Sequence, residues 1–192
     1  MRVLIAENAG KLHLDPGDVN RERLLAALCM KETRGWQNRQ PNFEPAYYKG
    51  GAYFNAERFN RVGLLADPIL KDFMGLLSAC SFGPFQMMYP VACELGFTEF
   101  PLELADPRIN IEFAIRYINA RCIPFVTAKK AEDIVAQVAD GYNSGNPVDR
   151  RVPQIYIDEV LAYYRQADLF DHLQTLRGYY RPAAPARATG NG

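Results

Sequence analysis

Residues 20–35 read NRERLLAALCMKETRG and indicate the fold class most clearly. Asp18 or Asn20 can cap a helix here, because a short side chain with an oxygen accepts a hydrogen bond from the first free backbone N–H groups. Gly35 is placed to end the helix. Three apolar side chains follow the i, i+3, i+4 spacing of one buried helix face: Leu25, Leu28 and Cys29. Glu32 continues that face, so we expect its carboxyl to leave the buried side of the helix.

Later segments show the same helical signals. Asp67-Pro68 and Asp106-Pro107 each place an N-cap residue before a proline at the first helical position. Apolar stripes predict further helices over 131–141 and from Pro153 onward. The stripe that follows Asp106 consists of Ile111, Ile115, Ile118 and Cys122.

Two segments lack a helical period. Residues 36–62 are rich in Asn, Gly, Pro and aromatic side chains, which is typical of a long functional loop with at most a short hairpin. The stretch from Arg181 onward is of low complexity and is expected to be disordered. We therefore predict a mainly α fold, with one helical domain over residues 1–180 and a disordered tail over 181–192.

The composition excludes several classes of protein. The 192 residues include 22 Lys and Arg against 22 Asp and Glu, so the chain lacks the basic surplus of a nucleic-acid binder. No apolar run approaches the roughly 20 residues that span a bilayer. The run Val3-Leu4-Ile5-Ala6 is shorter than the apolar centre of a signal peptide, so no signal peptide is visible. The four cysteines form no Cys-x-x-Cys motif, and we expect free thiols and no metal site.

Glu32 is the strongest candidate for chemistry. Burial and the nearby helix C-terminus both favour its neutral form, and a carboxyl that stays protonated near neutral pH can act as a general acid. The alternative is a surface carboxylate at a frayed helix end, paired with Lys31 or Arg34.

Two further segments contain groups that suit ligand binding. In the run SFGPFQMM over residues 81–88, Gly83 permits close approach of the backbone to a ligand, and the Gln86 amide can donate and accept. In the run DGYNSGNP over residues 140–147, Tyr142 can hold a buried carboxyl or stack on a sugar. The alternatives are an ordinary turn between packed helices and an ordinary helix C-cap.

The order of these segments resembles a known family. Lys31-Glu32-Thr33, then residues 81–88, then Tyr142-Asn143-Ser144-Gly145, then Tyr156-Ile157-x-x-Val160 resemble the soluble lytic transglycosylases of the lysozyme-like superfamily, to which goose-type lysozymes are related. That family's motifs run Glu-Ser, Gly-Leu-Met-Gln, Ala-Tyr-Asn-Ala-Gly and a late Tyr-Val. Residues 104–111, with Asp-Pro-x-x-Asn, match the start of its intervening helix.

The resemblance covers residues 20–166 and has departures. Thr33 stands where the family usually has Ser, Pro84-Phe85 replaces Leu-Met, and Ser144 replaces Ala. The segment between the first two motifs is also longer than in the simplest members. We expect these differences to change the shape of the binding site next to Gln86 and the substrate specificity.

The resemblance implies a lysozyme-like domain that cleaves peptidoglycan. Glu32 would protonate the β-1,4 glycosidic oxygen between N-acetylmuramic acid and N-acetylglucosamine, and then act as base to close a 1,6-anhydro ring. Tyr142 would hydrogen-bond to Glu32. No metal or organic cofactor is needed. The substrate-binding residues implied are Ser81, Gly83, Gln86, Tyr142, Asn143 and Tyr156.

Other outcomes remain open at this stage. If Glu44 lies about 6.5–9.5 Å from Glu32 across the cleft, it could activate water and make the protein a hydrolytic muramidase. The alternative is a loop carboxylate before Pro45. A glycan-binding module without activity is a third outcome. Loop aromatics either line a glycan cleft or fasten the loop to the core: Trp36, Phe43, Tyr47, Tyr48, Tyr53, Phe54 and Phe59.

The expected context follows from the implied substrate. The partner would be the peptidoglycan strand, which places the activity in the periplasm or outside the cell, by an export route that the sequence does not show. Recognition would depend on the cleft itself, because the zero net charge offers no general attraction to an anionic wall. We expect a monomer.

Overall fold

The computed structural model describes residues 1–15, 17–35, 40–48, 51, 75–145 and 152–172. Within these ranges the chain is mainly helical, as predicted. The expected helix start at Asp67-Pro68 and the expected tail over 181–192 lie outside the described residues. None of the described helices combines the length and the apolar character needed to traverse a bilayer.

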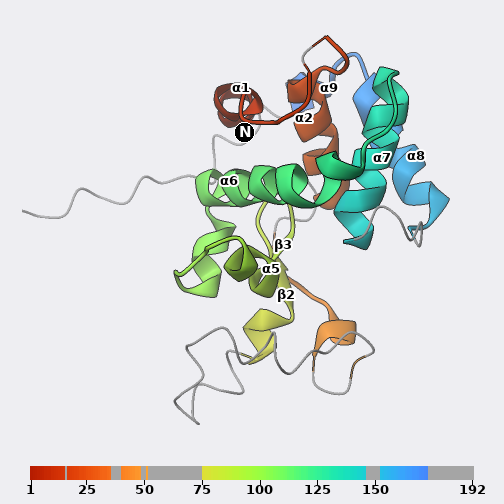
Figure 1. Ribbon diagram of the computed structural model, residues 1–192. Coiled ribbons are helices and arrows are strands. Elements are labelled where there is room, and N and C mark those ends of the chain that lie inside the picture. The colour runs from red at the N-terminus through yellow and green to blue at the C-terminus, as the bar shows by residue number, and fades with distance from the viewer. Residues whose placement is uncertain (16, 36–39, 49–50, 52–74, 146–151, 173–192) are drawn as a thin grey trace, which may run out of the picture.

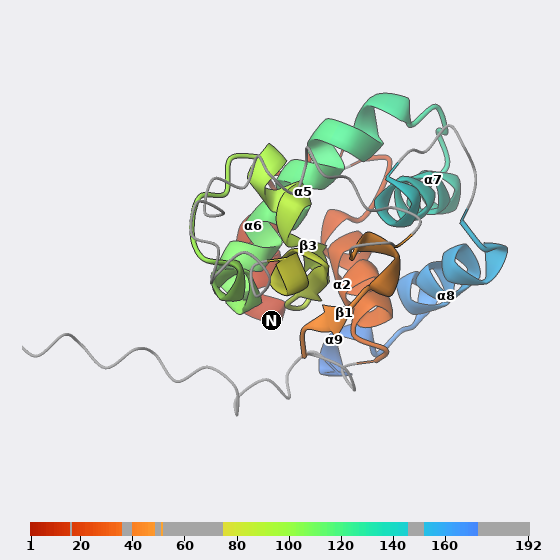
Figure 2. The same ribbon diagram turned by 90° about the horizontal axis from the view of Figure 1, so that it is seen from below.

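One group of helices forms the larger part of the molecule. It contains α1 (Arg2–Ala9), α2 (Arg21–Glu32), α7 (Ala131–Ser144), α8 (Gln154–Arg165) and α9 (Leu169–His172). Helix α2 packs against α8, and α8 packs against α7. Seen from below, α7 and α8 both lie to one side of α2 (Figure 2). The C-terminal end of α2 thereby lies among side chains from α7 and α8.

Helix α6 (Pro107–Tyr117) separates this group from a smaller one (Figure 1). The smaller group contains a three-stranded antiparallel sheet in the order β1 (Asn42–Phe43), β2 (Cys80–Phe82) and β3 (Met87–Met88). Short helices complete it: η1 (Pro45–Tyr47), α5 (Tyr89–Glu94) and η2 (Pro101–Ala105). After α6 the chain continues through a π-helical turn, η3 (Ile118–Cys122), and a 3-10 turn, η4 (Ile123–Phe125).

The helix signals of the sequence have the expected local causes. The Asn20 side chain caps α2 by accepting from the Arg23 N–H, and Asp106 caps α6 by accepting from the Arg108 N–H. The stripe predicted on α6 and η3 is buried throughout: Ile111, Ile115, Ile118 and Cys122. Apolar side chains of α2 and α6 therefore meet in one core that extends under both groups.

Two expectations about local structure need correction. Helix α7 runs to Ser144 rather than ending at residue 141, because Gly145 supplies the left-handed C-cap at φ 70°. The apolar stripe after Asp67-Pro68 predicts a helix face that continues to Cys80, but the described part of this helix ends at residue 78 and β2 begins at Cys80. The short strand β1 pairs with the distant β2, and much of the segment 36–62, where a short hairpin was expected at most, lies outside the described residues.

The four cysteines are free thiols, as expected. Cys29, Cys80 and Cys122 are buried, and Cys93 is half-buried. Among the described side chains, no group of three or more His, Cys, Asp or Glu is placed to hold a metal ion.

Candidate active site

Glu32 is the last residue of α2, and its carboxyl interacts with Tyr156 of α8 and with the charge of Glu44 beside β1. The chain turns sharply after Glu32, because Arg34 and Gly35 both have positive φ and the Gly35 N–H returns to the Met30 carbonyl at 2.8 Å. Thr33 is fully buried, and its hydroxyl donates to the Cys29 carbonyl at 2.7 Å. The helix end is therefore fixed by hydrogen bonds rather than frayed.

The Glu32 carboxyl has one direct side-chain partner. The Tyr156 hydroxyl of α8 donates a short hydrogen bond to Glu32 Oε1. Tyr156 itself is 7% exposed and belongs to the core. The structure gives Tyr156 a contact with Glu32, and its expected role in substrate binding stays a prediction. The same contact corrects the choice of Tyr142 as the residue that hydrogen-bonds to Glu32.

The surroundings of Glu32 raise its pKa to about 7. Burial of the carboxyl is the main cause, because a low-dielectric environment disfavours the charged form. The hydrogen bond from Tyr156 and the charge of Lys31 act in the opposite direction, and the negative charge of Glu44 raises the pKa further. At neutral pH a large fraction of Glu32 is protonated, as a general acid requires.

Tyr142 lies close to Glu32 but contacts a different partner. Its hydroxyl donates to the Phe85 carbonyl at 2.7 Å and lies 3.3 Å from Met87 Sδ. Burial and the nearby charge of Glu32 raise the pKa of Tyr142 well above its ordinary value. Tyr142 therefore links α7 to the turn between β2 and β3, on the side that faces Glu32.

That turn is closed by the side chains predicted to bind substrate. The Ser81 hydroxyl donates to Gln86 Oε1 at 2.8 Å, and Gln86 Nε2 donates to the Gly83 carbonyl at 2.8 Å. Gln86 adopts a positive φ of 46°, which few residues other than glycine adopt. Both ends of the Gln86 amide thus have a partner inside the turn, whereas the sequence suggests an amide directed at a ligand.

Gly83 allows close approach of another part of the protein. A Cβ at this position would lie 2.6 Å from Asn110 Cγ and 2.7 Å from the Leu104 carbonyl oxygen. Its φ of 69° also favours glycine. The requirement for glycine is therefore explained by packing against α6.

Asn110 is a residue that sequence reasoning did not assign. It is fully buried on α6, accepts from the Phe85 N–H at 2.7 Å and donates to the carbonyls of Phe82 and Leu104 at 2.8 and 2.9 Å. It fixes the turn through three hydrogen bonds. The signal for it was present in the Asp-Pro-x-x-Asn start of the helix, where a fully buried Asn needs several partners.

Glu44 lies on the same side of the molecule as Glu32. It follows β1, its backbone N–H donates to the Ala79 carbonyl at 2.8 Å, and Asn42 Nδ2 donates to its Oε1 at 2.5 Å. Its negative charge raises the pKa of both Glu32 and Cys80. The structure thus places a second carboxyl within electrostatic range of Glu32.

Of the other predicted residues, those that the structure describes lie on α7 and in or next to β1 and η1. Asn143 is exposed on the last turn of α7, next to Tyr142. Phe43 and Tyr47 are 42% and 38% exposed, and the Phe43 ring meets Tyr48 edge to face at 5.7 Å. Trp36, Tyr53, Phe54 and Phe59 lie outside the described residues.

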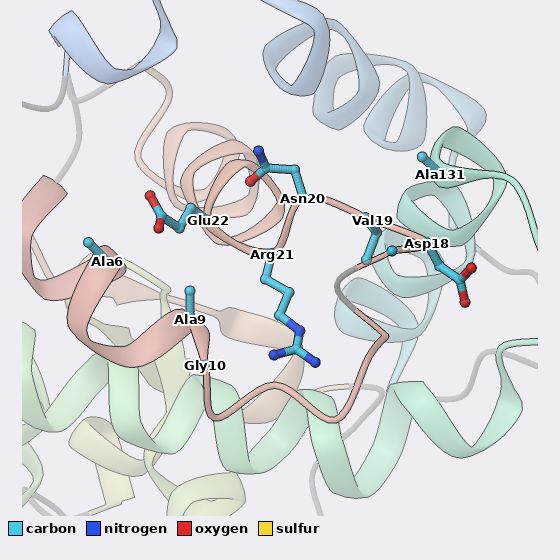
Figure 3. A pocket seen from close by; sticks show the side chains of 10 residues that line it. Ala6, Ala9, Gly10, Asp18, Val19, Asn20, Arg21, Glu22 and Ala131 are labelled. Carbon is cyan, nitrogen blue, oxygen red and sulfur yellow. The ribbon is translucent and has the colours of Figure 1, made fainter.

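Two pockets in the described part of the chain lie away from Glu32. One of about 470 Å³ lies between α1 and the start of α2, where Arg21 and Asp18 contribute to its wall (Figure 3). The other, of about 710 Å³, lies along α6 and is lined by Lys11, His13 and Arg116 among others. Neither contains a residue predicted to act in the candidate site.

The site brings together a carboxyl that is half-protonated near neutral pH, a buried tyrosine that holds it, and a second carboxyl nearby. This set can transfer a proton to a leaving oxygen and recover it. Comparison of the chain with protein-family models, curated proteins and solved structures finds no match.

Proposed function

We propose that this protein is a peptidoglycan-cleaving enzyme with a lysozyme-like helical domain, in which Glu32 is the general acid. The observation that supports the proposal best is the Glu32 carboxyl itself, with its pKa raised to about 7 and its orientation fixed by Tyr156. The order of the sequence motifs supports the choice of substrate, since Tyr156 contacts this carboxyl and Tyr142, which lies close to it, contacts the turn of residues 81–88.

Glu32 would act twice in a lytic transglycosylase reaction. It first donates its proton to the β-1,4 glycosidic oxygen between N-acetylmuramic acid and N-acetylglucosamine, and the N-acetyl carbonyl of the substrate stabilises the cationic centre. The ionised Glu32 then takes the proton of the C6 hydroxyl as the 1,6-anhydro ring closes. We assign the transferable proton to Oε2, because Oε1 accepts from Tyr156. This chemistry needs one carboxyl and no metal or organic cofactor.

The remaining predicted residues have supporting roles in this proposal. The turn of Ser81, Gly83 and Gln86 presents a rigid backbone toward the sugar, held in shape by Asn110. Tyr142 fixes the same turn through the Phe85 carbonyl. The exposed Asn143 and the exposed ring of Phe43 are available to a glycan strand at the cell wall.

A second candidate function is hydrolysis, which the charge of Glu44 near Glu32 favours. In an inverting glycosidase one carboxyl protonates the leaving oxygen while another activates water on the opposite face of the sugar. The hydrogen bond from Asn42 keeps the Glu44 carboxyl in place on the small sheet. Glu44 would then be the base, and the product would carry a reducing end.

Product analysis of digested cell walls tests both candidates. Purified peptidoglycan is incubated with the protein, and the soluble muropeptides are identified by mass spectrometry. Products that end in 1,6-anhydromuramic acid indicate the lyase, and reducing ends indicate the hydrolase. Glu32→Gln should abolish either activity, whereas Glu44→Gln should abolish only the hydrolase.

Glu132→Gln is a matched control, because this exposed glutamate lies on α7 and pairs with Arg165. A Glu32→Gln variant with full activity would contradict the proposal. Glycan binding without cleavage by the wild type would indicate a binding module of the same fold.

A further inference from the structure

Lys31 lies beside the acid and contacts two residues of α8. Its ammonium forms an ion pair with Glu159, and the same ammonium lies 5.1 Å from the centre of the Tyr156 ring. The side chains of Lys31 and Glu159 are 24% and 47% exposed, and Tyr156 is 7% exposed, so the contact of Lys31 with the ring is better shielded from water than the ion pair. Shielding matters because a cation above an aromatic face is attracted more strongly when solvent is excluded.

The Tyr156 ring is therefore fixed from two sides. Its face meets the Lys31 ammonium, and its hydroxyl at the far end of the ring donates to Glu32 Oε1. Glu159 lies one helical turn after Tyr156 on α8 and anchors the ammonium above the ring. Lys31 and Glu32 are neighbours on α2, so the contacts close a ring of side chains between α2 and α8.

We propose that Lys31, anchored by Glu159, is a positioning residue for the acid: it holds the Tyr156 ring and thereby the hydroxyl that orients Glu32. This inference rests on the proposed function for its catalytic consequence. It goes beyond that function, because it assigns a role to an ion pair that does not contact the substrate.

Lys31 also acts on Glu32 through its charge. The positive charge favours the ionised carboxylate and lowers the pKa of Glu32, in the same direction as the Tyr156 hydrogen bond. Glu44 from the β1 side and burial act in the opposite direction. Tyr142 from α7 lies close to the same carboxyl and has a pKa raised well above its ordinary value, so it stays neutral at neutral pH. Removal of the Lys31 charge should therefore raise the pKa of Glu32.

The test compares Lys31→Met with Lys31→Arg and Glu159→Gln. Lys31→Met keeps most of the side-chain volume but removes the charge and the contact with the ring. We expect its kcat to fall about two- to fivefold, the effect of losing a cation–π contact of ordinary strength. We also expect the fall in activity at high pH to occur at a higher pH than in the wild type. Lys31→Arg should keep both kcat and the high-pH limit of activity close to those of the wild type. Glu159→Gln should lower kcat, as Lys31→Met does.

Arg165→Met is the control, because Arg165 forms a comparable exposed ion pair between α8 and α7 at a distance from Glu32. This variant should leave the pH profile unchanged. A Lys31→Met variant whose kcat falls while its pH profile stays fixed would overturn the inference, since loss of packing alone does not move a pKa.

A second measurement separates this inference from the proposed function. The Glu32 carboxyl is titrated by carbon-13 NMR in protein labelled at glutamate, with Glu32→Gln used to assign the signal. Lys31→Met should raise the observed pKa even if the wild type cleaves no peptidoglycan. An unchanged Glu32 titration in Lys31→Met would overturn the inference whatever the enzyme assay shows.

Discussion

Replacement of Glu32 by Gln should stabilise the protein at high pH and leave its stability unchanged in acid. The pKa of Glu32 is raised from 4.5 to about 7 in the folded protein, mainly by burial. Below pH 4.5 the carboxyl is protonated in both the folded and the unfolded states and costs nothing. Between pH 4.5 and 7 only the unfolded state loses the proton, so the free energy of unfolding decreases as the pH rises.

The size of the effect follows from the same pKa difference. One pH unit corresponds to about 1.36 kcal/mol, so a pKa raised from 4.5 to about 7 costs the wild type up to about 3 kcal/mol above pH 7. Glu32 is only half-buried by its exposed area, and solvent screening reduces this upper bound. We expect Glu32→Gln to be about 1–3 kcal/mol more stable than the wild type at pH 8.5. Glutamine can still accept the hydrogen bond from Tyr156.

Urea unfolding followed by circular dichroism at pH 4 and pH 8.5 measures the difference directly. Glu132→Gln is the control, for which we expect the opposite effect on stability at high pH. The hydrogen bond from Arg165 lowers the pKa of Glu132, so this substitution should remove stability at pH 8.5 rather than add it. If Glu32→Gln had the same effect on stability at both pH values, the argument that Glu32 is an acid with a raised pKa would be refuted.

Two other predictions follow from the contacts around the site. Tyr156→Phe removes a hydrogen bond to the ionised carboxylate, worth about 1.5–3 kcal/mol, so the pKa of Glu32 and the high-pH limit of activity should rise by about one to two units, as a pH–rate profile would show. Asn110→Ala leaves the Phe85 N–H and two buried carbonyls without their partner, and should lower the free energy of unfolding by at least about 3 kcal/mol in urea titration. A loss below about 1 kcal/mol would show that water replaces the Asn110 side chain.

The helices could be predicted from the sequence, because interactions between residues close in the chain determine them. Asn20 and Asp106 cap the helices that they were predicted to cap, and the apolar stripe after Asp106 is buried. The N-cap bond joins residues close in sequence, and an apolar period of 3.6 is visible in any single helix. Glu32 was selected by the same rule, from its place on the apolar face of one helix.

The partners of Glu32 could not be predicted in the same way. The hydrogen bond from Tyr156 spans 124 positions, and the bond from Tyr142 to the Phe85 carbonyl spans 57. The packing of α7 and α8 against α2 decides whether Tyr142 or Tyr156 reaches the Glu32 carboxyl. The spacing of residues within one segment does not predict this packing. The pairing of β1 with β2 escaped prediction for the same reason, since its two strands are separated by the whole loop region.

Asn110 holds the turn between β2 and β3 almost entirely through main-chain atoms. It bonds to the Phe82 and Leu104 carbonyls and to the Phe85 N–H, and Tyr142 adds a bond to the Phe85 carbonyl. Main-chain atoms are the same in every residue, apart from the missing N–H of proline. The hydrogen bonds that fix the turn therefore do not require a proline at position 84, or a particular apolar side chain at position 85. The amino-acid sequence of this turn can therefore change during evolution while its geometry is kept.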